Sequence, residues 1–329
     1  MSTPRKPPTR NLALDLVRAT EAAALNAAQW VGRGEKIAGD GAAVEAMRAV
    51  LNITPMNAKV VIGEGEKDEA PMLYSGERVG TGEGPEIDLA IDPIEGTSLM
   101  ALGRPGAFAV IGAAPAGAFL ETGPSFYAAK IVVGAGARGA IDLNASTADN
   151  VREIAHALNK RISQVTIFVL GKPRHEGLID EIRHAGARVT VQPEGDVAGA
   201  ILAALPDSAV DATMGTGGTP EGIITAAAVQ ALGGDMRMRL DPQQEDEKAD
   251  LAAAGFDLTR VYKLDELCSS KQTHFAATGI TDGPMLQGVR YHAHEAVTHS
   301  LAIRGQTGTL RFIESHHHLD KVEGIINVD

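Results

Sequence analysis

Acidic side chains are concentrated between Ile62 and Glu95, a stretch that holds ten acidic and only two basic residues. Most of these acids can lie on a solvated surface, but Glu64 and Asp92 each end an apolar run that reads as a buried strand. A carboxylate in such a place is costly unless it is paired or bound to a metal. Because Mg²⁺ and Mn²⁺ prefer oxygen ligands, the two residues indicate a divalent-metal site. The alternative is an ordinary strand–turn–helix junction with capping acids.

The segment IDPIEGTSL, residues 91–99, adds the other groups that hydrolysis of a phosphate ester needs. Pro93 fixes its own φ, and Gly96 lets the backbone turn tightly so that a helix can begin. The N–H groups of a helix start suit an anion, and the hydroxyl of Thr97 can hydrogen-bond a water held at a metal. Metal charge, an activated water and an anion cradle together favour phosphatase chemistry.

In the first 150 residues, the sequence predicts two helices followed by strands, and these elements must position the acids and Thr97. The spacing of apolar residues predicts an amphipathic helix over 11–34 and a second over 42–51, with Asp40 standing where its N-cap would be. Strands are expected at 59–62, 87–92 and 107–114, the last one returning antiparallel to its predecessor, and a hairpin at 130–134 and 139–143. This part of the chain is therefore expected to be an α+β domain.

The rhythm changes from about residue 150 onward. Helix and strand patterns alternate over 150–160, 164–171, 175–186, 187–193, 196–205, 208–215 and 220–233. Such alternation predicts a parallel α/β sheet. The acidic run 241–250 is expected to be a solvated loop, and strand-like pieces return from residue 273. We therefore expect an N-terminal domain over 1–150 and a C-terminal α/β domain over 151–329.

Composition excludes several classes of function. The 329 residues carry a net charge of −12, which argues against a nucleic-acid or anionic-membrane partner. The one cysteine, Cys268, excludes an intrachain disulfide and zinc sites built from several cysteines. Neither a signal peptide nor an apolar run of membrane-spanning length is recognisable, so a cytoplasmic protein is expected.

The motif DPIEGT resembles the D-P-(I/L/V)-(D/E)-G-T signature of the lithium-sensitive, metal-dependent sugar and inositol phosphatases. Further stretches narrow the match, in the order GRGEK, DGAAVEAMR, VIGEGEKDEAPMLY, DPIEGT, DLNASTADN, KPRH, GDVA, GTGGTPEG, ALGGDM, ATGITDG and LAIRG. Together they resemble class II fructose-1,6-bisphosphatase, the bacterial type, from about residue 11 to about residue 320. The resemblance implies a layered αβαβα sandwich.

The resemblance also implies a set of metal ligands and catalytic residues. Asp40 and Glu64 match ligands of one metal, Asp92 and Glu95 match ligands of a second, and Glu221 matches a further ligand from the C-terminal half. The implied cofactor is Mg²⁺ or Mn²⁺ at two or more sites. Thr97 matches the threonine that orients or activates the attacking water, and with Glu64 it is the predicted catalytic pair.

The implied substrate contacts come from both halves of the chain. They are Glu95, Gly96, Thr97, Tyr127, Lys172, Pro173, Arg174, Glu194, Gly195, Asp196 and Gly218. Independently of the resemblance, Lys172 and Arg174 follow a predicted strand, where their charges are available to a phosphate and the arginine can bind it through two hydrogen bonds. The alternative for this pair is a basic surface turn.

The expected reaction is hydrolysis of the C1 phosphate of fructose 1,6-bisphosphate in gluconeogenesis. One alternative is a dual enzyme that also accepts sedoheptulose 1,7-bisphosphate, and another is a non-catalytic protein that binds divalent cations or sugar phosphates. The resemblance further implies a homo-oligomer, a dimer or a tetramer. The run His316–His318 is expected to have a structural or surface role, because consecutive residues of a strand point to opposite faces.

Overall fold

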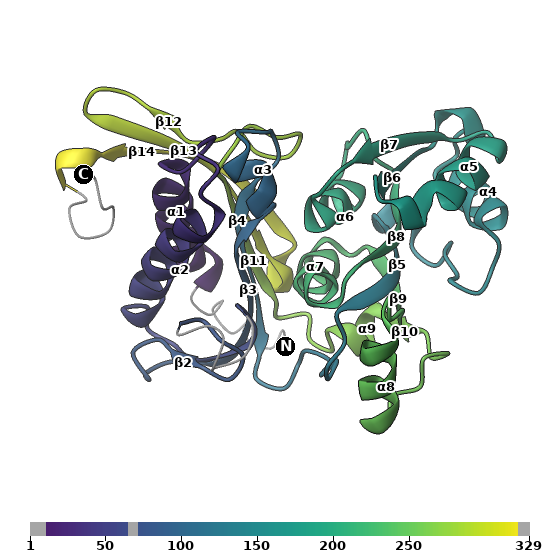
Figure 1. Cartoon of the computed structure of the whole chain (residues 1–329), viewed down its shortest axis with the longest axis horizontal. Coiled ribbons are helices and arrows are strands. Elements are labelled where there is room, and N and C mark those ends of the chain that lie inside the picture. The colour runs from purple at the N-terminus through teal and green to yellow at the C-terminus, as the bar shows by residue number, and fades with distance from the viewer. Residues whose placement is uncertain (1–10, 65–71, 322–329) are drawn as a thin grey trace, which may run out of the picture.

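The computed structural model describes residues 11–64 and 72–321, and its elements form five layers (Figure 1). Within these residues the layers follow one another as two helices, an eight-stranded sheet, two helices, a six-stranded sheet and two helices. The helical layers are α1 (Leu12–Ala28) with α2 (Lys36–Asn52), α6 (Asp196–Ala204) with α7 (Thr219–Leu232), and α4 (Thr147–Ala157) with α5 (Glu176–His184). The predicted layered α/β fold is therefore confirmed.

The first sheet draws its strands from both ends of the chain. It contains β1 (Asn57–Ile62), β2 (Arg78–Val79), β3 (Glu86–Glu95), β4 (Phe108–Pro115), β11 (His274–Gly279), β12 (Arg290–Tyr291), β13 (Glu295–Arg304) and β14 (Thr309–His318). The order is β12-β13-β11-β4-β3-β1-β2, and β14 pairs with β13 outside this path. Strand β3 pairs parallel with β1 and antiparallel with β4, as the sequence predicted for the 107–114 strand.

The second sheet is mixed, so the prediction of a parallel sheet was only partly right. Its order is β10 (Tyr262–Lys263), β9 (Asp235–Leu240), β5 (Tyr127–Val133), β8 (Ala212–Gly218), β6 (Thr166–Leu170) and β7 (Arg188–Gln192). Strand β6 pairs parallel with β7 and β8, whereas β5 runs antiparallel to both β8 and β9. Strand β5 arrives from the first sheet without a crossover helix, which a parallel neighbour would require.

The predicted hairpin at 130–134 and 139–143 is wrong. Residues 139–143 form no strand; a short 3₁₀ turn, η1 (Ala135–Ala137), follows β5 instead. Both edges of β5 are already occupied by β8 and β9, so no edge is left for a hairpin partner. The division into two domains at residue 150 stays a prediction.

Helix α7 lies between the two sheets and is therefore apolar on all sides. Its residues from Gly222 to Val229 are all buried, which is the pattern of a helix without a solvent face. Small side chains let the layers approach: a Cβ on Gly112 of β4 would lie only 3.1 Å from the Cβ of Ala227. The central layer is thus held by close packing against both sheets, and α7 keeps a fixed position relative to each of them.

Two local predictions need correction. Asp40 is not an N-cap, because α2 already begins at Lys36 and places Asp40 about one turn inside the helix. The acidic run 241–250 is not a loop, because helix α8 (Glu245–Ala253) begins within it, and acids in a first turn suit the helix dipole. Its buried Glu247 accepts hydrogen bonds from the backbone N–H groups of Phe126 and Tyr127, at 2.7 and 2.9 Å.

The three histidines near the end of the described chain lie on opposite faces of β14, as predicted. His317 is hydrogen-bonded to Thr298 at 2.8 Å, whereas the exposed His316 pairs with Glu295 and Glu314. No helix among the described residues is both long and apolar enough to span a bilayer.

Candidate active site

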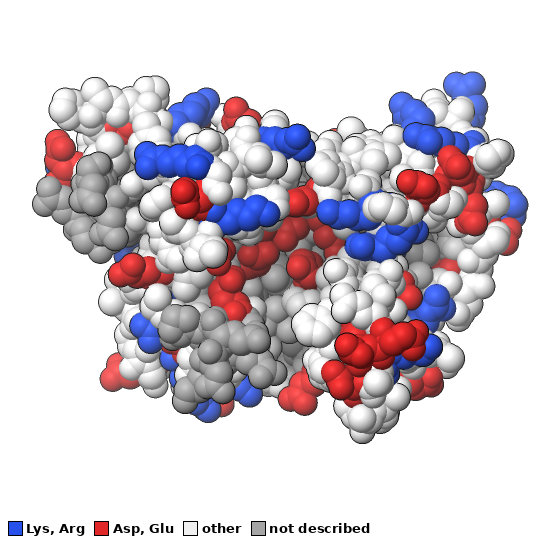
Figure 2. Space-filling view, in the orientation of Figure 1, with Lys and Arg blue, Asp and Glu red and all other residues white. Residues whose placement is uncertain are grey.

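A cavity of about 490 Å³ opens between the two sheets. Figure 2 shows the hollow from its open side, with acidic side chains at its centre and basic side chains along its upper rim. The lining residues are Lys36, Ile37, Asp40, Glu64, Asp92, Ile94, Glu95, Gly96, Thr97, Ser98, Leu170, Lys172, Arg174, Glu194, Gly195, Asp196, Gly217, Gly218 and Glu221. The cavity thus brings together all five of the predicted metal ligands.

The DPIEGT motif forms the tight junction between β3 and the short helix α3 (Thr97–Ala101). The N–H of Ile94 donates to Oδ1 of Asp92 at 3.0 Å, and the hydroxyl of Thr97 donates to the carbonyl of Ile94 at 3.0 Å. Gly96 makes the turn possible at a φ of +83°, in the left-handed region that favours glycine. Because its proton is used in this bond, the Thr97 hydroxyl meets a water as an acceptor.

The carboxylates on the first-sheet side lie as two neighbouring pairs, Asp40 with Glu64 and Asp92 with Glu95, and in each pair one group influences the pKa of the other. Burial and the neighbouring Asp40 raise the pKa of Glu64 to about 7. Burial and the charge of Glu221 raise the pKa of Glu95 to about 8. Burial, followed by the charges of its acidic neighbours, raises the pKa of Asp92 well above its ordinary value. Crowded acids of this kind favour a protonated form unless positive charge is supplied.

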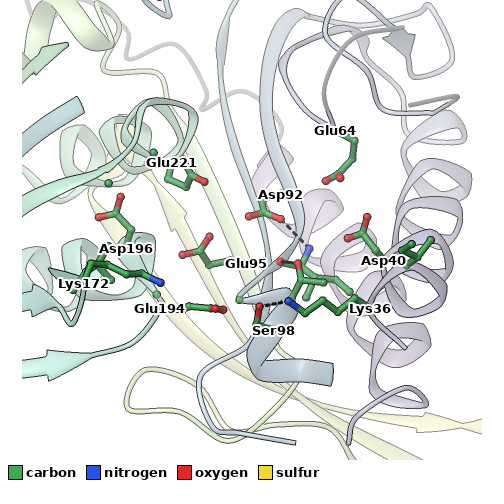
Figure 3. A pocket seen from close by; sticks show the side chains of 18 of the residues that line it. Lys36, Asp40, Glu64, Asp92, Glu95, Ser98, Lys172, Glu194, Asp196 and Glu221 are labelled. Carbon is green, nitrogen blue, oxygen red and sulfur yellow. Dashed lines mark hydrogen bonds between the residues drawn. The ribbon is translucent and has the colours of Figure 1, made fainter. Parts of the chain in front are cut away.

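Glu221 projects from the first turn of α7 toward these pairs (Figure 3). Its Oε2 atom is buried and, among the described residues, has no hydrogen-bond partner. The space for this side chain depends on Gly218, because a Cβ there would lie 1.6 Å from that same oxygen. A buried carboxylate oxygen without a partner carries a high desolvation cost, which a bound cation removes.

The donor set fits a hard divalent cation, because carboxylate oxygens are what Mg²⁺ and Mn²⁺ prefer. Within residues 11–64 and 72–321, no three acidic, histidine or cysteine side chains are already close enough together to enclose a metal ion. The fit therefore rests on the type of the donors, on their crowding and on the unpartnered oxygen of Glu221.

The second-sheet side is organised around a buried ion pair. Lys130 of β5 pairs with Asp196, the first residue of α6, and donates to the carbonyl of Gly218 at 2.7 Å. A Cβ on Gly217 would lie 2.0 Å from Oδ2 of Asp196, so this glycine leaves room for the carboxylate. The two sides of the cavity meet where the N–H of Val197 donates to Oε1 of Glu95 at 3.4 Å.

The cationic end of the cavity is formed by Lys172 and Arg174, at the turn after β6. Arg174 donates from Nε and Nη2 to the carbonyl of Thr216, at 3.1 and 2.9 Å, and its guanidinium lies 5.1 Å from the centre of the Tyr127 ring. Tyr127 and Pro173 are not among the residues that line the cavity. The geometry therefore gives Tyr127 contact with Arg174 rather than with the cavity itself.

Two lysines of the site were missed in the sequence analysis. Lys36 lines the cavity and donates to the hydroxyl of Ser98 (Figure 3), and Lys130 is almost fully buried behind Asp196. Lys36 stands in the quoted stretch GRGEK but has no chemical partner nearby in sequence. Lys130 did give a signal, because a lysine inside an apolar strand is costly unless it is paired.

Comparison with known proteins identifies the family of the chain. Residues 10–317 match the model of the family described as bacterial fructose-1,6-bisphosphatase, glpX-encoded. The chain is 46% identical over 325 residues to fructose-1,6-bisphosphatase 1 class 2 of Escherichia coli (strain K12), which covers 95% of the chain and 96% of that relative. The same values hold for the class 2 fructose-1,6-bisphosphatases of Escherichia coli O6:H1 and Shigella flexneri. The chain therefore belongs to the glpX-encoded family of bacterial fructose-1,6-bisphosphatases.

Proposed function

We propose that this protein hydrolyses the C1 phosphate of fructose 1,6-bisphosphate to give fructose 6-phosphate and phosphate, in gluconeogenesis. The observation that carries the proposal is the cavity in which five carboxylates face the cations Lys172 and Arg174, in a chain that belongs to this family. A bisphosphate needs two centres of positive charge. The carboxylate cluster can hold cations for the cleaved phosphate, and the basic turn faces the other end of the substrate.

The metal is proposed to be Mg²⁺ or Mn²⁺ at two or more sites, held by Asp40, Glu64, Asp92, Glu95 and Glu221. When bound, such ions neutralise the charge of the scissile phosphate and lower the pKa of a coordinated water. The remaining steps belong to the side chains of the protein.

Thr97 and Glu64 are proposed to handle the attacking water. The Thr97 oxygen is available as an acceptor, because its proton is donated to Ile94, and this fixes one O–H of the water. Glu64 faces the same space as Asp92 in Figure 3 and can take the proton that the water loses. The two residues together orient the water toward the phosphorus and accept its proton.

The sugar and the phosphate that is not cleaved are proposed to bind on the second-sheet side. Lys172 and Arg174 are suited to this phosphate, Arg174 because its guanidinium is held by Thr216 and presents fixed N–H groups. Glu194 and Asp196 can accept hydrogen bonds from sugar hydroxyls. Gly96, Gly195 and Gly218 line the cavity without side chains that would fill it.

Phosphate release from a small panel of substrates tests the proposal. We expect rapid release from fructose 1,6-bisphosphate with Mg²⁺ or Mn²⁺, slow release from inositol monophosphate, and none with EDTA. Equal release from sedoheptulose 1,7-bisphosphate would support a dual enzyme. Absence of metal-dependent release from every substrate would support a non-catalytic binding protein, although the complete DPIEGT motif speaks against it.

We also propose that the protein acts in the cytoplasm as a homo-oligomer, a dimer or a tetramer, as the family resemblance implies. Light scattering coupled to size-exclusion chromatography measures the subunit number directly. A single species at the mass of one 34.3 kDa chain across the micromolar range would refute the proposed assembly.

A further inference from the structure

A second cavity, of about 660 Å³, lies at the opposite ends of the two helices that reach the active site. It is larger than the active-site cavity. Its lining residues lie in the turn after β5, after the ends of α4, α6 and α7, at Lys271 and around Gly308. These residues come from six separate segments, so the cavity is a product of the tertiary fold.

The charges around this cavity differ from those of the molecule as a whole. Three cations, Arg138, Lys160 and Lys271, line it together with two acids, Asp207 and Asp211, although the chain has a net charge of −12. Lys160 and Asp211 form an ion pair with each other. Among the described residues, the side chains of Arg138 and Lys271 have no ion-pair partner. Two cations are thus available to an anion in a generally acidic protein.

Part of the lining of this cavity is apolar. Leu158, Leu205, Leu232 and Leu310 line it, together with the buried Val210. A free inorganic anion would leave these side chains in contact with water, whereas a ring or a carbon chain would cover them. An apolar lining with cations beside it fits a small organic molecule that carries a phosphate, sulfonate or carboxylate group.

Helices α6 and α7 run from one cavity to the other. Helix α6 begins at Asp196 in the active site and ends beside Ala203 to Leu205, and α7 carries Glu221 in its first turn and ends beside Gln230 to Gly233. At 1.5 Å per residue, the 9 residues of α6 span about 13 Å and the 14 residues of α7 about 21 Å. Figure 1 shows the two helices side by side in the layer between the sheets.

We propose that this second cavity binds a small organic anion through Arg138 and Lys271, and that binding there changes the activity of the site at the other end of α6 and α7. A packed helix transmits displacement along its axis, so a ligand that favours one position of the helix ends also favours one position of Asp196 and Glu221. The binding half of the proposal stands on the cavity alone. The coupling half rests on the proposed function.

Two related dyes separate the role of the anion from that of the apolar surface. The probe is 8-anilinonaphthalene-1-sulfonate, and its uncharged analogue, N-phenyl-1-naphthylamine, has the same rings without the sulfonate. Fluorescence titration is done with the full chain in Mg²⁺, for the wild type and for the double variant Arg138→Gln, Lys271→Gln. The double variant Arg183→Gln, Lys248→Gln removes the same charge from exposed helix positions and serves as the control.

We expect the cavity variant to bind the sulfonate at least about tenfold more weakly, equivalent to about 1.4 kcal/mol, and the uncharged dye equally well. The control variant should match the wild type with both dyes. The binding half is overturned if the wild type does not bind the sulfonate, or if the cavity variant binds it as tightly as the wild type does. It is also overturned if the cavity variant loses affinity for both dyes equally. If Lys172→Gln loses sulfonate binding while the cavity variant retains it, the dye binds in the active site, and the binding half is overturned as well.

The coupling half is tested by phosphate release from fructose 1,6-bisphosphate at saturating sulfonate. We expect kcat or KM of the wild type to change at least about twofold, and the cavity variant to show no change at the same dye concentration. Binding without any kinetic effect in an active wild-type enzyme would overturn the coupling. If the wild type releases no phosphate even without the dye, it is the proposed function that fails, and the binding result still stands.

Discussion

At the scale of single residues, the candidate active site contains buried carboxylates that need compensating positive charge to stay ionised. Within the described residues, one buried oxygen of Glu221 has no hydrogen-bond partner, and the charge of Glu95 helps to raise the pKa of its neighbour Asp92. On the other side of the cavity, the charge of Asp196 is compensated within the protein by Lys130. Asp92, Glu95 and Glu221 are therefore acids that require an external cation, whereas Asp196 does not.

This difference predicts how Glu221→Gln behaves. The change removes one like charge and keeps the shape of the side chain, so the metal-free protein should be as stable as the wild type or more stable. Mg²⁺ should raise the melting temperature of both proteins, and the rise in the wild type should be at least about twice the rise in the variant. The reason is that a ligand stabilises the state that binds it, and the variant binds Mg²⁺ more weakly. Thermal unfolding with and without Mg²⁺ measures this. An identical rise in both proteins would show that Glu221 does not bind the metal. The control is Glu153→Gln, which removes one negative charge from the exposed face of α4.

The buried lysine leads to a second prediction. Lys130→Met leaves Asp196 without its partner and should lower the free energy of unfolding by about 3 kcal/mol. The double variant Lys130→Met, Asp196→Asn should regain part of this loss, because the uncompensated charge is gone. Urea unfolding measures both. A loss below about 1 kcal/mol in the single variant would mean that the ion pair contributes little to the fold.

At the scale of elements, the glycines before α7 make the site possible. Gly218→Ala would place a Cβ in the space of the Glu221 carboxylate, and this carboxylate would have to leave the cavity. We expect kcat/KM to fall at least about a hundredfold, since displacement of a positioned group by about 1 Å costs on this order. Gly177→Ala is the matched control, because a Cβ at this position of α5 meets nothing within 4 Å. Equal activity of the two variants would refute the packing argument.

Elements with strong local signals were predictable from the sequence. The strands and helices between 150 and 233 follow from their periodicity and from the Gly and Pro residues between them, and each is found at nearly its expected place. The direction of β5 was not predictable, because its partners β8 and β9 come much later in the chain. The acidic helix α8 was missed because its sequence is largely polar, and its buried Glu247 binds to a distant backbone segment.

The residues of the candidate site likewise fall into those that could be predicted from the sequence and those that could not. Its acids and its threonine stand in short motifs, so a resemblance of a few residues was enough to name them. Lys36 and Lys130 stand alone in sequence, and their partners Ser98 and Asp196 are 62 and 66 positions away. Contacts of that kind form only when distant elements pack together, α2 against α3 for Lys36 and β5 against α6 for Lys130.

At the scale of the whole molecule, the first sheet joins the two ends of the chain, and β11 lies between β4 and β13. His274, the first residue of β11, is largely buried, and its Nδ1 has no hydrogen-bond partner within the described part of the chain. Burial, together with the charge of Arg304, lowers the pKa of His274 to about 4. The folded protein therefore holds this imidazole neutral, at a pH where the unfolded chain would protonate it.

This depressed pKa fixes the sign of a pH effect on stability. Because the folded state binds the proton less readily, the contribution of His274 is unaffected above about pH 6.5 and is lost progressively down to about pH 4. The full loss is about 3 kcal/mol at most. The wild type should therefore lose more stability than His274→Leu between pH 7.5 and pH 4.5, as measured by urea unfolding. Parallel pH curves for the two proteins would show that His274 is not a source of acid sensitivity.

The central claim is that DPIEGT, with cations held by the surrounding acids, positions a water for attack on a phosphate, and Thr97→Ala tests it most directly. Steady-state phosphate release from fructose 1,6-bisphosphate in Mg²⁺ should show kcat reduced at least about a hundredfold, with KM and the melting temperature close to those of the wild type. Thr97→Ser, which keeps the hydroxyl, should retain most of the activity. Turnover of Thr97→Ala near that of the wild type would contradict the account.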